Sequence, residues 1–289
     1  MRELTVSVTI PGKHVQEVYV KQERYPMKER VYTHGEFCWY ELGTRDIAAA
    51  VRFYTELMDW QIHKHEMGEA GTYYIFQKEG GEVAAGYQMS GPQFEGIPPY
   101  WMPYLWVDDV DTTAARWVEK GGKVIAPPMD IPGDIGRMAF VQDPQGAPCA
   151  LFRGQAHTGA VDLAPAPGAF SWTELLTVDA AAARDFYSEL MGWTYAEVPM
   201  GAQGIYTVFQ CQGKPAAGMM QMQGPQFQGV PPHWASYLSV ADCDASVQKA
   251  LELGARVLVP PQDVPGTGRF SVLQDPTEAV FSVIAFFPM

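Results

Sequence analysis

The segment GPQFEGIPP at residues 91–99 occurs a second time as GPQFQGVPP at residues 224–232, 133 residues further along the chain. Two segments so rich in Gly and Pro do not match at this level by composition alone, so an internal repeat has to be considered before any other feature. The same offset relates Trp39-Tyr40-Glu41-Leu42 to Trp172-Thr173-Glu174-Leu175, and Phe53-Tyr54 to Phe186-Tyr187. A one-residue deletion then brings Gly136-Arg137 opposite Gly268-Arg269. The chain is therefore a tandem duplication.

The repeat length indicates two modules of ordinary domain size. The chain has 289 residues, of which 47% are hydrophobic and 18% charged, so it has ample material for a core. A period of 133 residues is too long for a solenoid repeat. We expect a first module over residues 35–153, a linker over 154–169 that is rich in Ala, Pro and Gly, and a second module over 170–287.

Charge and cysteine usage narrow the range of partners and compartments. The net charge of −13 argues against nucleic acid and anionic membranes as partners, since both attract clustered Lys and Arg. No apolar run approaches the roughly 20 residues that span a bilayer, and residues 1–4 do not resemble the start of a signal peptide. We therefore expect a cytoplasmic protein. Reduced thiols are expected because no CxxC pair occurs and no cysteine is shared by the modules, the four being Cys38, Cys149, Cys211 and Cys243.

Hydrophobic periodicity predicts a double β-α-β-β-β pattern in each module. In the first module, a strand over 37–42 precedes a helix over 46–60, for which Asp46 is a plausible N-cap. A hairpin around Gly80-Gly81 follows, and then a long loop that contains the repeated segment. The second half is predicted to contain a strand over 104–107, a helix over 111–120, and short strands over 123–125, 138–142 and 148–152. The fold class is therefore α+β, with mixed or antiparallel sheets.

Residues 1–33 have no counterpart in the repeat. Alternating residues over 4–10 and 15–20 flank Pro11-Gly12-Lys13, a pattern that fits a β-hairpin added to the sheet or to a dimer partner. A mobile extension fits as well, and monomer and homodimer both stay open.

The order of the repeated sequence motifs resembles that in the vicinal oxygen chelate superfamily, which includes glyoxalase I, extradiol dioxygenases and bleomycin-binding proteins. The matching words are Phe53-Tyr54 with Asp59-Trp60, Phe186-Tyr187 with Gly192-Trp193, and Asp143-Pro144 before the last strand of the first module. The resemblance is closest to the tandem-module, glyoxalase-like branch. It implies a curved sheet in each module and a cavity between the modules.

In metal-dependent members of that superfamily, three positions in a module hold a divalent ion. The resemblance places these positions at Trp39, near Met102 and Ala150 in the first module, and at Trp172, near Ala235 and Ser282 in the second. None offers the imidazole, carboxylate or thiolate that such ions prefer. The usual metal centre is therefore expected to be missing, and no cofactor is predicted, although a divalent metal held by other residues stays possible.

Two repeated glutamates are the candidate acid/base groups. Alternation along the first strand places Phe37, Trp39 and Glu41 on one face, and Trp172 and Glu174 repeat this arrangement. In an aromatic cavity, the pKa of such a carboxyl would rise toward a value useful for proton transfer. The alternative pairs each carboxylate with a repeated arginine, Glu41 with Arg137 and Glu174 with Arg269, and this structural role is the one we favour.

The remaining candidates would bind a ligand or fill the core. Repeated aromatic residues at strand positions are more often core than ligand platform. His63 and His65 alternate along one segment, but Ala196 and Val198 occupy the equivalent positions. The candidate ligand-binding residues are Trp39, Trp172, Trp101, Trp234, Tyr104, Tyr237, Arg137, Arg269 and His233.

Three functions fit these observations. The first is a glyoxalase-like enzyme, a lyase or oxidoreductase, that acts on a small carbonyl or aromatic metabolite without the usual metal. The second is a non-catalytic protein that sequesters a flat hydrophobic molecule, as antibiotic-binding members of the superfamily do. In the third, residues 1–33 mediate assembly and the modules are a scaffold.

Overall fold

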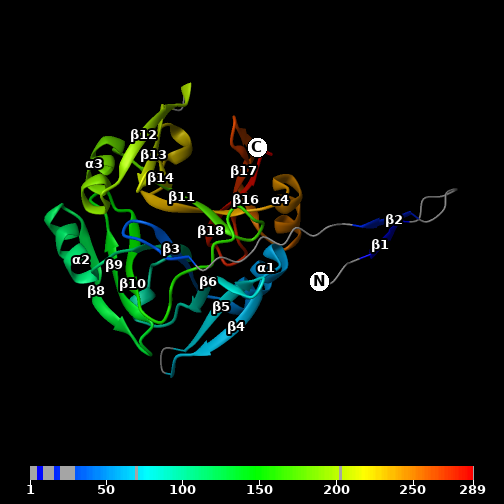
Figure 1. Cartoon of the computed structure of the whole chain (residues 1–289), viewed down its shortest axis with the longest axis horizontal. Helices are drawn as coiled ribbons and strands as arrows, with labels where there is room; N and C mark the ends of the chain where they lie inside the picture. The colour runs from blue at the N-terminus through cyan, green and yellow to red at the C-terminus, as the bar shows by residue number, and fades with distance from the viewer. Residues whose placement is uncertain (1–4, 9–15, 20–29, 69–70, 202–203, 289) are drawn as a thin grey trace.

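The computed structural model describes residues 30–68, 71–201 and 204–288, together with the backbone of residues 5–8 and 16–19. Two curved eight-stranded sheets pack against each other, one from each module (Figure 1). The central strands of the two sheets touch, and the helices pair beside them, α1 with α4 and α2 with α3. The chain is therefore mixed α+β, built from two tandem modules.

The first sheet joins two β-α-β-β-β units. Its strand order is β4-β5-β6-β3-β7-β10-β9-β8. The pairs β3–β6 and β7–β10 are parallel, whereas β3 and β7 run antiparallel and join the two units. The elements are β3 (Phe37–Thr44), α1 (Ile47–Met58), β4 (Gln61–Glu66), β5 (Thr72–Lys78), β6 (Gly81–Gln88), β7 (Tyr100–Trp106), α2 (Val110–Glu119), β8 (Lys123–Ile131), β9 (Gly136–Gln142) and β10 (Pro148–Gly154).

The second sheet repeats this order as β12-β13-β14-β11-β15-β18-β17-β16. The repeated Gly-Pro-Gln-Phe segments form short 3-10 turns, η2 (Pro92–Phe94) and η4 (Pro225–Phe227), in equivalent loops. The other elements are β11 (Phe170–Thr177), α3 (Ala180–Met191), β12 (Thr194–Pro199), β13 (Ile205–Cys211), β14 (Lys214–Gln221), β15 (His233–Ser239), α4 (Cys243–Glu252), β16 (Arg256–Val264), β17 (Gly268–Gln274) and β18 (Val280–Phe286).

Each helix begins at an aspartate whose side chain accepts a hydrogen bond from the backbone three residues on, namely Asp46, Asp109, Asp179 and Asp242. The helix predicted over 46–60 spans Ile47–Met58 and ends at Asp59, whose φ of 54° is left-handed. Gly192, with a φ of 66°, ends the equivalent helix α3. Strand β4 contains the alternating His63 and His65, a segment that sequence analysis found strand-like but did not include among the predicted strands, because most of its residues are polar.

A β-bulge corrects the predicted alternation of the first strand. The pairing of β3 with β7 shifts between Phe37 and Trp39, and β11 has the same shift between Phe170 and Trp172. The extra residue turns Phe37 toward the helices, where it packs on Trp234 with ring centroids 5.0 Å apart. The prediction that Phe37 shares a face with Trp39 and Glu41 is therefore wrong.

One continuous hydrophobic core spans both modules. Polar bonds cross it in symmetric pairs: Tyr54 Oη donates to Asp275 Oδ2 at 2.9 Å, and Tyr187 Oη donates to Asp143 Oδ2 at 3.2 Å. The hydroxyl of Tyr40 also lies 2.8 Å from Thr173 Oγ1 across the interface. The modules are thus one packed unit.

The N-terminal region and the linker lie outside the repeat. Strands β1 (Thr5–Val8) and β2 (Gln16–Tyr19) pair antiparallel and extend away from the modules (Figure 1); the predicted turn between them lies outside the described residues. The linker returns across the first sheet, where Ala160 N donates to the Cys38 carbonyl and Tyr32 Oη donates to the Ala160 carbonyl.

The four cysteines are free and buried. Among the helices of the described residues, none is long and apolar enough to cross a membrane.

Candidate functional site

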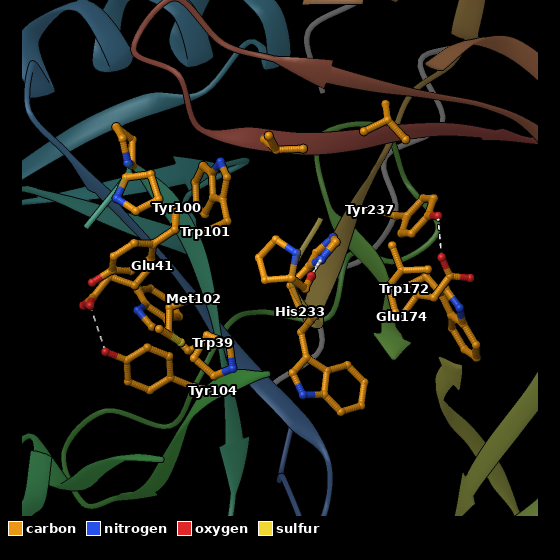
Figure 2. Close-up of a pocket in the computed structure, with 18 of the residues that line it drawn as sticks. Trp39, Glu41, Tyr100, Trp101, Met102, Tyr104, Trp172, Glu174, His233 and Tyr237 are labelled. Atoms are coloured by element: carbon orange, nitrogen blue, oxygen red, sulfur yellow. Dashed lines mark hydrogen bonds between the residues drawn. The ribbon is translucent and has the colours of Figure 1, made fainter. Parts of the chain in front are cut away.

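Each sheet turns its concave face away from the helices, and a buried glutamate lies in the middle of that face. We call the concave face around Trp39, Glu41, Tyr73, Met102 and Tyr104 the first cup. We call the equivalent face around Trp172, Glu174, Tyr206, Ala235 and Tyr237 the second cup. A hollow of about 2280 Å³ takes its lining from both modules, and both carboxyls belong to it. Figure 2 shows the two carboxyls on opposite sides of the view, each bonded to a tyrosine.

In the first cup, two tyrosines hold Glu41. Tyr73 Oη donates to Glu41 Oε2 at 2.6 Å, and Tyr104 Oη donates to Oε1 at 2.8 Å (Figure 2). Tyr73 in turn accepts a hydrogen bond of 3.1 Å from Trp39 Nε1. Both carboxyl oxygens are therefore bonded by hydroxyl groups of the protein.

The second cup uses the same residue types but bonds them differently. Tyr237 Oη donates to Glu174 Oε2 at 2.9 Å. Tyr206 accepts a hydrogen bond of 2.8 Å from Trp172 Nε1. Tyr206 lies near the same carboxyl and helps to lower its pKa, but within the described part of the chain it forms no well-formed hydrogen bond to either oxygen.

Burial raises the pKa of both carboxyls. Removal from water disfavours the ionised form of Glu41 and of Glu174, while the tyrosine hydroxyls partly offset this by stabilising the anion. The glutamates are 8% and 7% exposed, and their hydrogen-bond donors are neutral hydroxyls. Each cup thus holds a carboxyl suited to exchanging a proton with a bound molecule.

The predicted pairing of each glutamate with an arginine is wrong. Arg137 Nε donates to Asp111 at 2.6 Å and its Nη1 donates to Asp130 at 2.9 Å. Arg269 makes the equivalent bonds to Asp244 and Asp263, at 2.7 and 2.9 Å. On β9, Arg137 and Ala139 are two residues apart and lie on the same face of the sheet, which is the face toward the helices. The side chain of Arg137 therefore points away from Glu41. Neither arginine lies in a cup.

Trp101 and Trp234 belong mainly to the core between the modules. Trp101 Nε1 donates to Tyr54 Oη at 2.8 Å, and Trp234 Nε1 donates to Tyr187 Oη at 3.1 Å. Trp101 and Tyr104 lie on opposite faces of β7, because side chains alternate along a strand, and Tyr104 is the one that faces the cup. The other aromatic candidates, Trp39, Trp172, Tyr104 and Tyr237, do lie beside the carboxyls.

His233 lies in the second cup at the start of β15, where its Nδ1 is 2.9 Å from the Pro231 carbonyl (Figure 2). Burial lowers the pKa of this imidazole. Its counterpart Tyr100 forms a 2.6 Å hydroxyl pair with Tyr87 in the first cup. His63 and His65 line the rim of that cup.

His157 also belongs to the first cup, and sequence analysis did not identify it, because it lies in the linker and has no counterpart in the repeat. Its ring packs edge-on against Trp39 with centroids 4.4 Å apart. His157 Nε2 also lies 3.4 Å from Glu82 Oε2, and this contact lowers the pKa of that carboxyl.

The donor set does not fit a metal ion of the usual kind. The three positions that the family resemblance assigns to metal ligands do meet, since Trp39 and Ala150 both pair with Tyr104, and Met102 pairs with Glu41. They bring together indole, methyl and thioether groups around one carboxyl. Within the described ranges, no three His, Cys, Asp or Glu residues form a group that could hold a metal.

Each module is a pair of β-α-β-β-β units with a buried carboxyl in its concave sheet. The profile of the Glyoxalase/Bleomycin resistance protein/Dioxygenase superfamily matches residues 37–150 and 169–283. The chain belongs to that superfamily.

Two curated relatives are similar over nearly the whole chain. "Putative glyoxylase CFP32" of Mycobacterium tuberculosis is 39% identical over 258 residues, which cover 89% of this chain and 97% of the relative. "Anthracycline biosynthesis protein DnrV" of Streptomyces peucetius is 37% identical over 265 residues, which cover 88% and 94%.

Solved structures share the fold at low sequence identity. The Mn(II)-bound glyoxalase from Novosphingobium aromaticivorans superimposes with a TM-score of 0.60 at 17% identity, covering 87% of this chain and 82% of that one. The 2,3-dioxygenase LapB from Pseudomonas sp. KL28 gives a TM-score of 0.56 at 12% identity, covering 89% and 95%.

Proposed function

We propose that this protein is a glyoxalase-like enzyme that acts on a small carbonyl or aromatic metabolite without the metal centre of its structural neighbours. The observation that carries the proposal is a buried carboxyl in each cup. Its hydrogen-bond partners are uncharged tyrosine hydroxyls, at 2.6–2.9 Å. Glu41 or Glu174 is the acid/base. Desolvation raises the pKa of both toward the range in which a carboxyl exchanges protons near neutral pH.

The chemistry that suits such a site is proton transfer at a carbon next to a carbonyl group. The carboxylate takes the proton, the carbon–hydrogen bond breaks, and its electron pair moves onto the carbonyl oxygen. The same carboxyl then returns the proton to a neighbouring atom, so that atoms and charge balance.

The relatives support a small organic ligand without naming it for this chain. Two of them carry names from anthracycline biosynthesis, DnrV and DauV. Anthracyclines are fused-ring aromatic ketones, so they combine the flat apolar surface and the carbonyl group that this type of site would bind. The relative named as a glyoxylase points to small carbonyl compounds instead.

The second candidate function is sequestration without turnover. The cups are lined largely by aromatic and aliphatic side chains around one carboxyl, which would hold a flat hydrophobic molecule whether or not it reacts. The superfamily to which the chain belongs includes bleomycin-resistance proteins by name.

Turnover and binding measurements on the purified protein separate these functions. Metal content is measured first, followed by turnover of methylglyoxal with and without glutathione, and with and without added Ni²⁺ or Zn²⁺. Turnover that needs metal would overturn the metal-free proposal. Ligand binding by tryptophan quenching with no turnover would favour sequestration.

The carboxyls are tested by Glu41→Gln, Glu174→Gln and the double variant, with the exposed Glu119→Gln as the matched control. General acid–base catalysis contributes about 10²–10⁴-fold, so loss of the active carboxyl should lower kcat by about that factor. An unchanged rate in the double variant would exclude both glutamates as the acid/base.

A further inference from the structure

The repeat allows each residue of the first cup to be compared with its counterpart in the second. The first cup is packed with its own side chains, because nine buried residues form a separate hydrophobic cluster there: Tyr32, Cys38, Trp39, Ala85, Met102, Tyr104, Trp106, Ala150 and Phe152. No equivalent cluster occurs among the described residues of the second cup. The two cups are therefore not equivalent.

Smaller side chains make room in the second cup. Met102, which pairs with Glu41, is replaced by Ala235, which pairs with Glu174. In the neighbouring strands β9 and β17, Phe140 is replaced by Val272 at the positions that pair with Ala150 and Ser282. Met138 and Phe270 change in the opposite sense, but they lie two pairs further along the strands.

The linker closes part of the first cup only. His157 covers the indole of Trp39, which is 4% exposed. Trp172, at the equivalent position, is half-buried, and no aromatic ring pair among the described residues includes it. The face of Trp172 is therefore more accessible to a flat molecule.

A single glycine changes the bonding of the second carboxyl. Gly218 pairs with Glu174 where Ala85 pairs with Glu41. A Cβ atom at Gly218 would lie 2.7 Å from Trp172 Nε1 and still closer to Tyr206 Oη, so only glycine admits this placement of the tyrosine. Tyr206 accepts a bond from Trp172, as Tyr73 does from Trp39, but unlike Tyr73 it makes no well-formed bond to the carboxyl, and Glu174 Oε1 keeps none within the described residues.

The walls of the second cup expose more apolar surface. Five apolar side chains that line it are more than a third exposed, compared with Ile97 and Ile125 in the first cup. The five are Val198, Val230, Leu258, Val280 and Phe286. Exposed apolar surface that surrounds a pocket commonly marks a ligand site.

We infer that the second cup is the ligand site and that its ligand is a flat, fused-ring aromatic molecule with a phenolic hydroxyl on its edge. The rings lie along the apolar walls and Trp172, and the hydroxyl donates to Glu174 Oε1. This inference rests on the proposed function and adds to it the module and the ligand class. In the first cup, Met102 and Phe140 replace Ala235 and Val272, and His157 covers Trp39, so the same molecule has less room there.

Counterpart exchange tests which cup binds. The probe is 1,2-dihydroxyanthraquinone, followed by tryptophan quenching and by calorimetry on the full chain. Ala235→Met and Val272→Phe install the first-cup residues in the second cup, and should each weaken binding by about tenfold or more through overpacking. The matched reverse variants Met102→Ala and Phe140→Val alter the first cup and should leave affinity within about twofold.

The stoichiometry provides a test that needs no variant. Calorimetry on the unmodified protein should give one probe molecule per chain, and two per chain would overturn the inference. It is also overturned if the first-cup variants change affinity while the second-cup variants, with unchanged circular dichroism spectra, do not.

The carboxyl contact is tested with a second probe that lacks the hydroxyl. Glu174→Gln should weaken binding of the dihydroxy compound by about fivefold to tenfold, because a charge-assisted hydrogen bond becomes a neutral one, and should leave binding of unsubstituted anthraquinone unchanged. The exposed control Glu119→Gln should change neither affinity.

The inference and the proposed function can fail separately. If turnover of a carbonyl substrate depends on Glu41 and is indifferent to Ala235→Met, the assignment to the second cup falls and the proposed enzyme stands. If the probe binds as expected but no compound is turned over, the second cup stands and the catalytic proposal falls. Absence of probe binding to the unmodified protein overturns the inference.

Discussion

Buried carboxyls need partners, and at Glu41 and Glu174 these partners are neutral hydroxyls rather than cations. Strand alternation correctly indicated that the glutamates lie beside Trp39 and Trp172. It did not identify their partners, because Tyr73 and Tyr206 come from a different strand, and their register is set by tertiary pairing. The arginines were predicted on the wrong face of the sheet. The alternation of residues 136–142 along the strand would have placed Arg137 on the face opposite to the glutamate.

The raised pKa of the two carboxyls predicts how stability depends on pH. A carboxyl whose pKa is higher in the folded state than in the unfolded state, about 4.3 for Glu, stabilises the fold below the unfolded pKa. That contribution is lost as pH rises through the folded pKa. The free energy of unfolding of the unmodified protein should therefore fall, relative to the double variant Glu41→Gln/Glu174→Gln, between pH 4 and neutral pH.

Urea unfolding of both proteins at several pH values measures this difference. Asp143 and Asp275, which burial also shifts upward in pKa, are present in both proteins and cancel. A difference that stays flat from pH 4 to 7 would contradict the upward shift.

Substitution of the arginines should affect stability but not ligand binding, in contrast to substitution of the glutamates. Arg137→Ala should lower the thermal midpoint slightly, because it removes the bonds to Asp111 and Asp130 that tie α2 to β8. Ligand affinity should not change, since the side chain points away from the cup. Arg269→Ala, the matched variant of the second module, should have the same effects. A loss of ligand binding in either variant would show that the arginines belong to the ligand site.

At the scale of the element, the bulges in β3 and β11 decide which residues reach each cup. Helices were predicted well because capping aspartates and an apolar stripe are local signals. The bulges were not predicted, because an extra residue in a strand is visible only against its partner. Strand β4 (Gln-Ile-His-Lys-His-Glu) was also missing from the predicted strands, because its place at one edge of the sheet depends on pairing with β5.

Strand β14 supplies a prediction for Gly218. Gly218→Ala should force Tyr206 away from Trp172, since the added methyl would occupy the position of the hydroxyl. We expect a lower thermal midpoint and a changed tryptophan emission spectrum. Ala85→Gly in the first cup is the matched reverse exchange and should leave the bonds between Tyr73 and Glu41 in place; an unchanged spectrum in Gly218→Ala would refute the steric argument.

At the scale of the molecule, the shared core makes folding a property of both modules together. The repeat period predicted two modules, and the structure adds that they share one hydrophobic core. Tyr54 and Tyr187 connect helices of one module to acidic turns of the other. Sequence alone could not pair them, because 221 and 44 residues separate the bonded partners.

Removal of one such hydroxyl should destabilise the whole chain. Tyr54→Phe leaves Trp101 Nε1 and the Asp275 carboxyl each short of a partner, which costs about 1–3 kcal/mol. Chemical denaturation should show a single transition at a lower midpoint. Tyr187→Phe should match it, and the exposed Tyr195→Phe should have little effect; separate transitions for the two modules would contradict a common core.

The path of the linker has a consequence for any chain made by doubling. Two copies need one join, and here the join passes over the first copy, where His157 lies on Trp39. The connection by itself therefore makes the two modules unequal, because it contacts Trp39 and has no counterpart in the repeat. The linker covers part of the first cup, where Trp39 is 4% exposed, whereas Trp172 of the second cup is only half-buried.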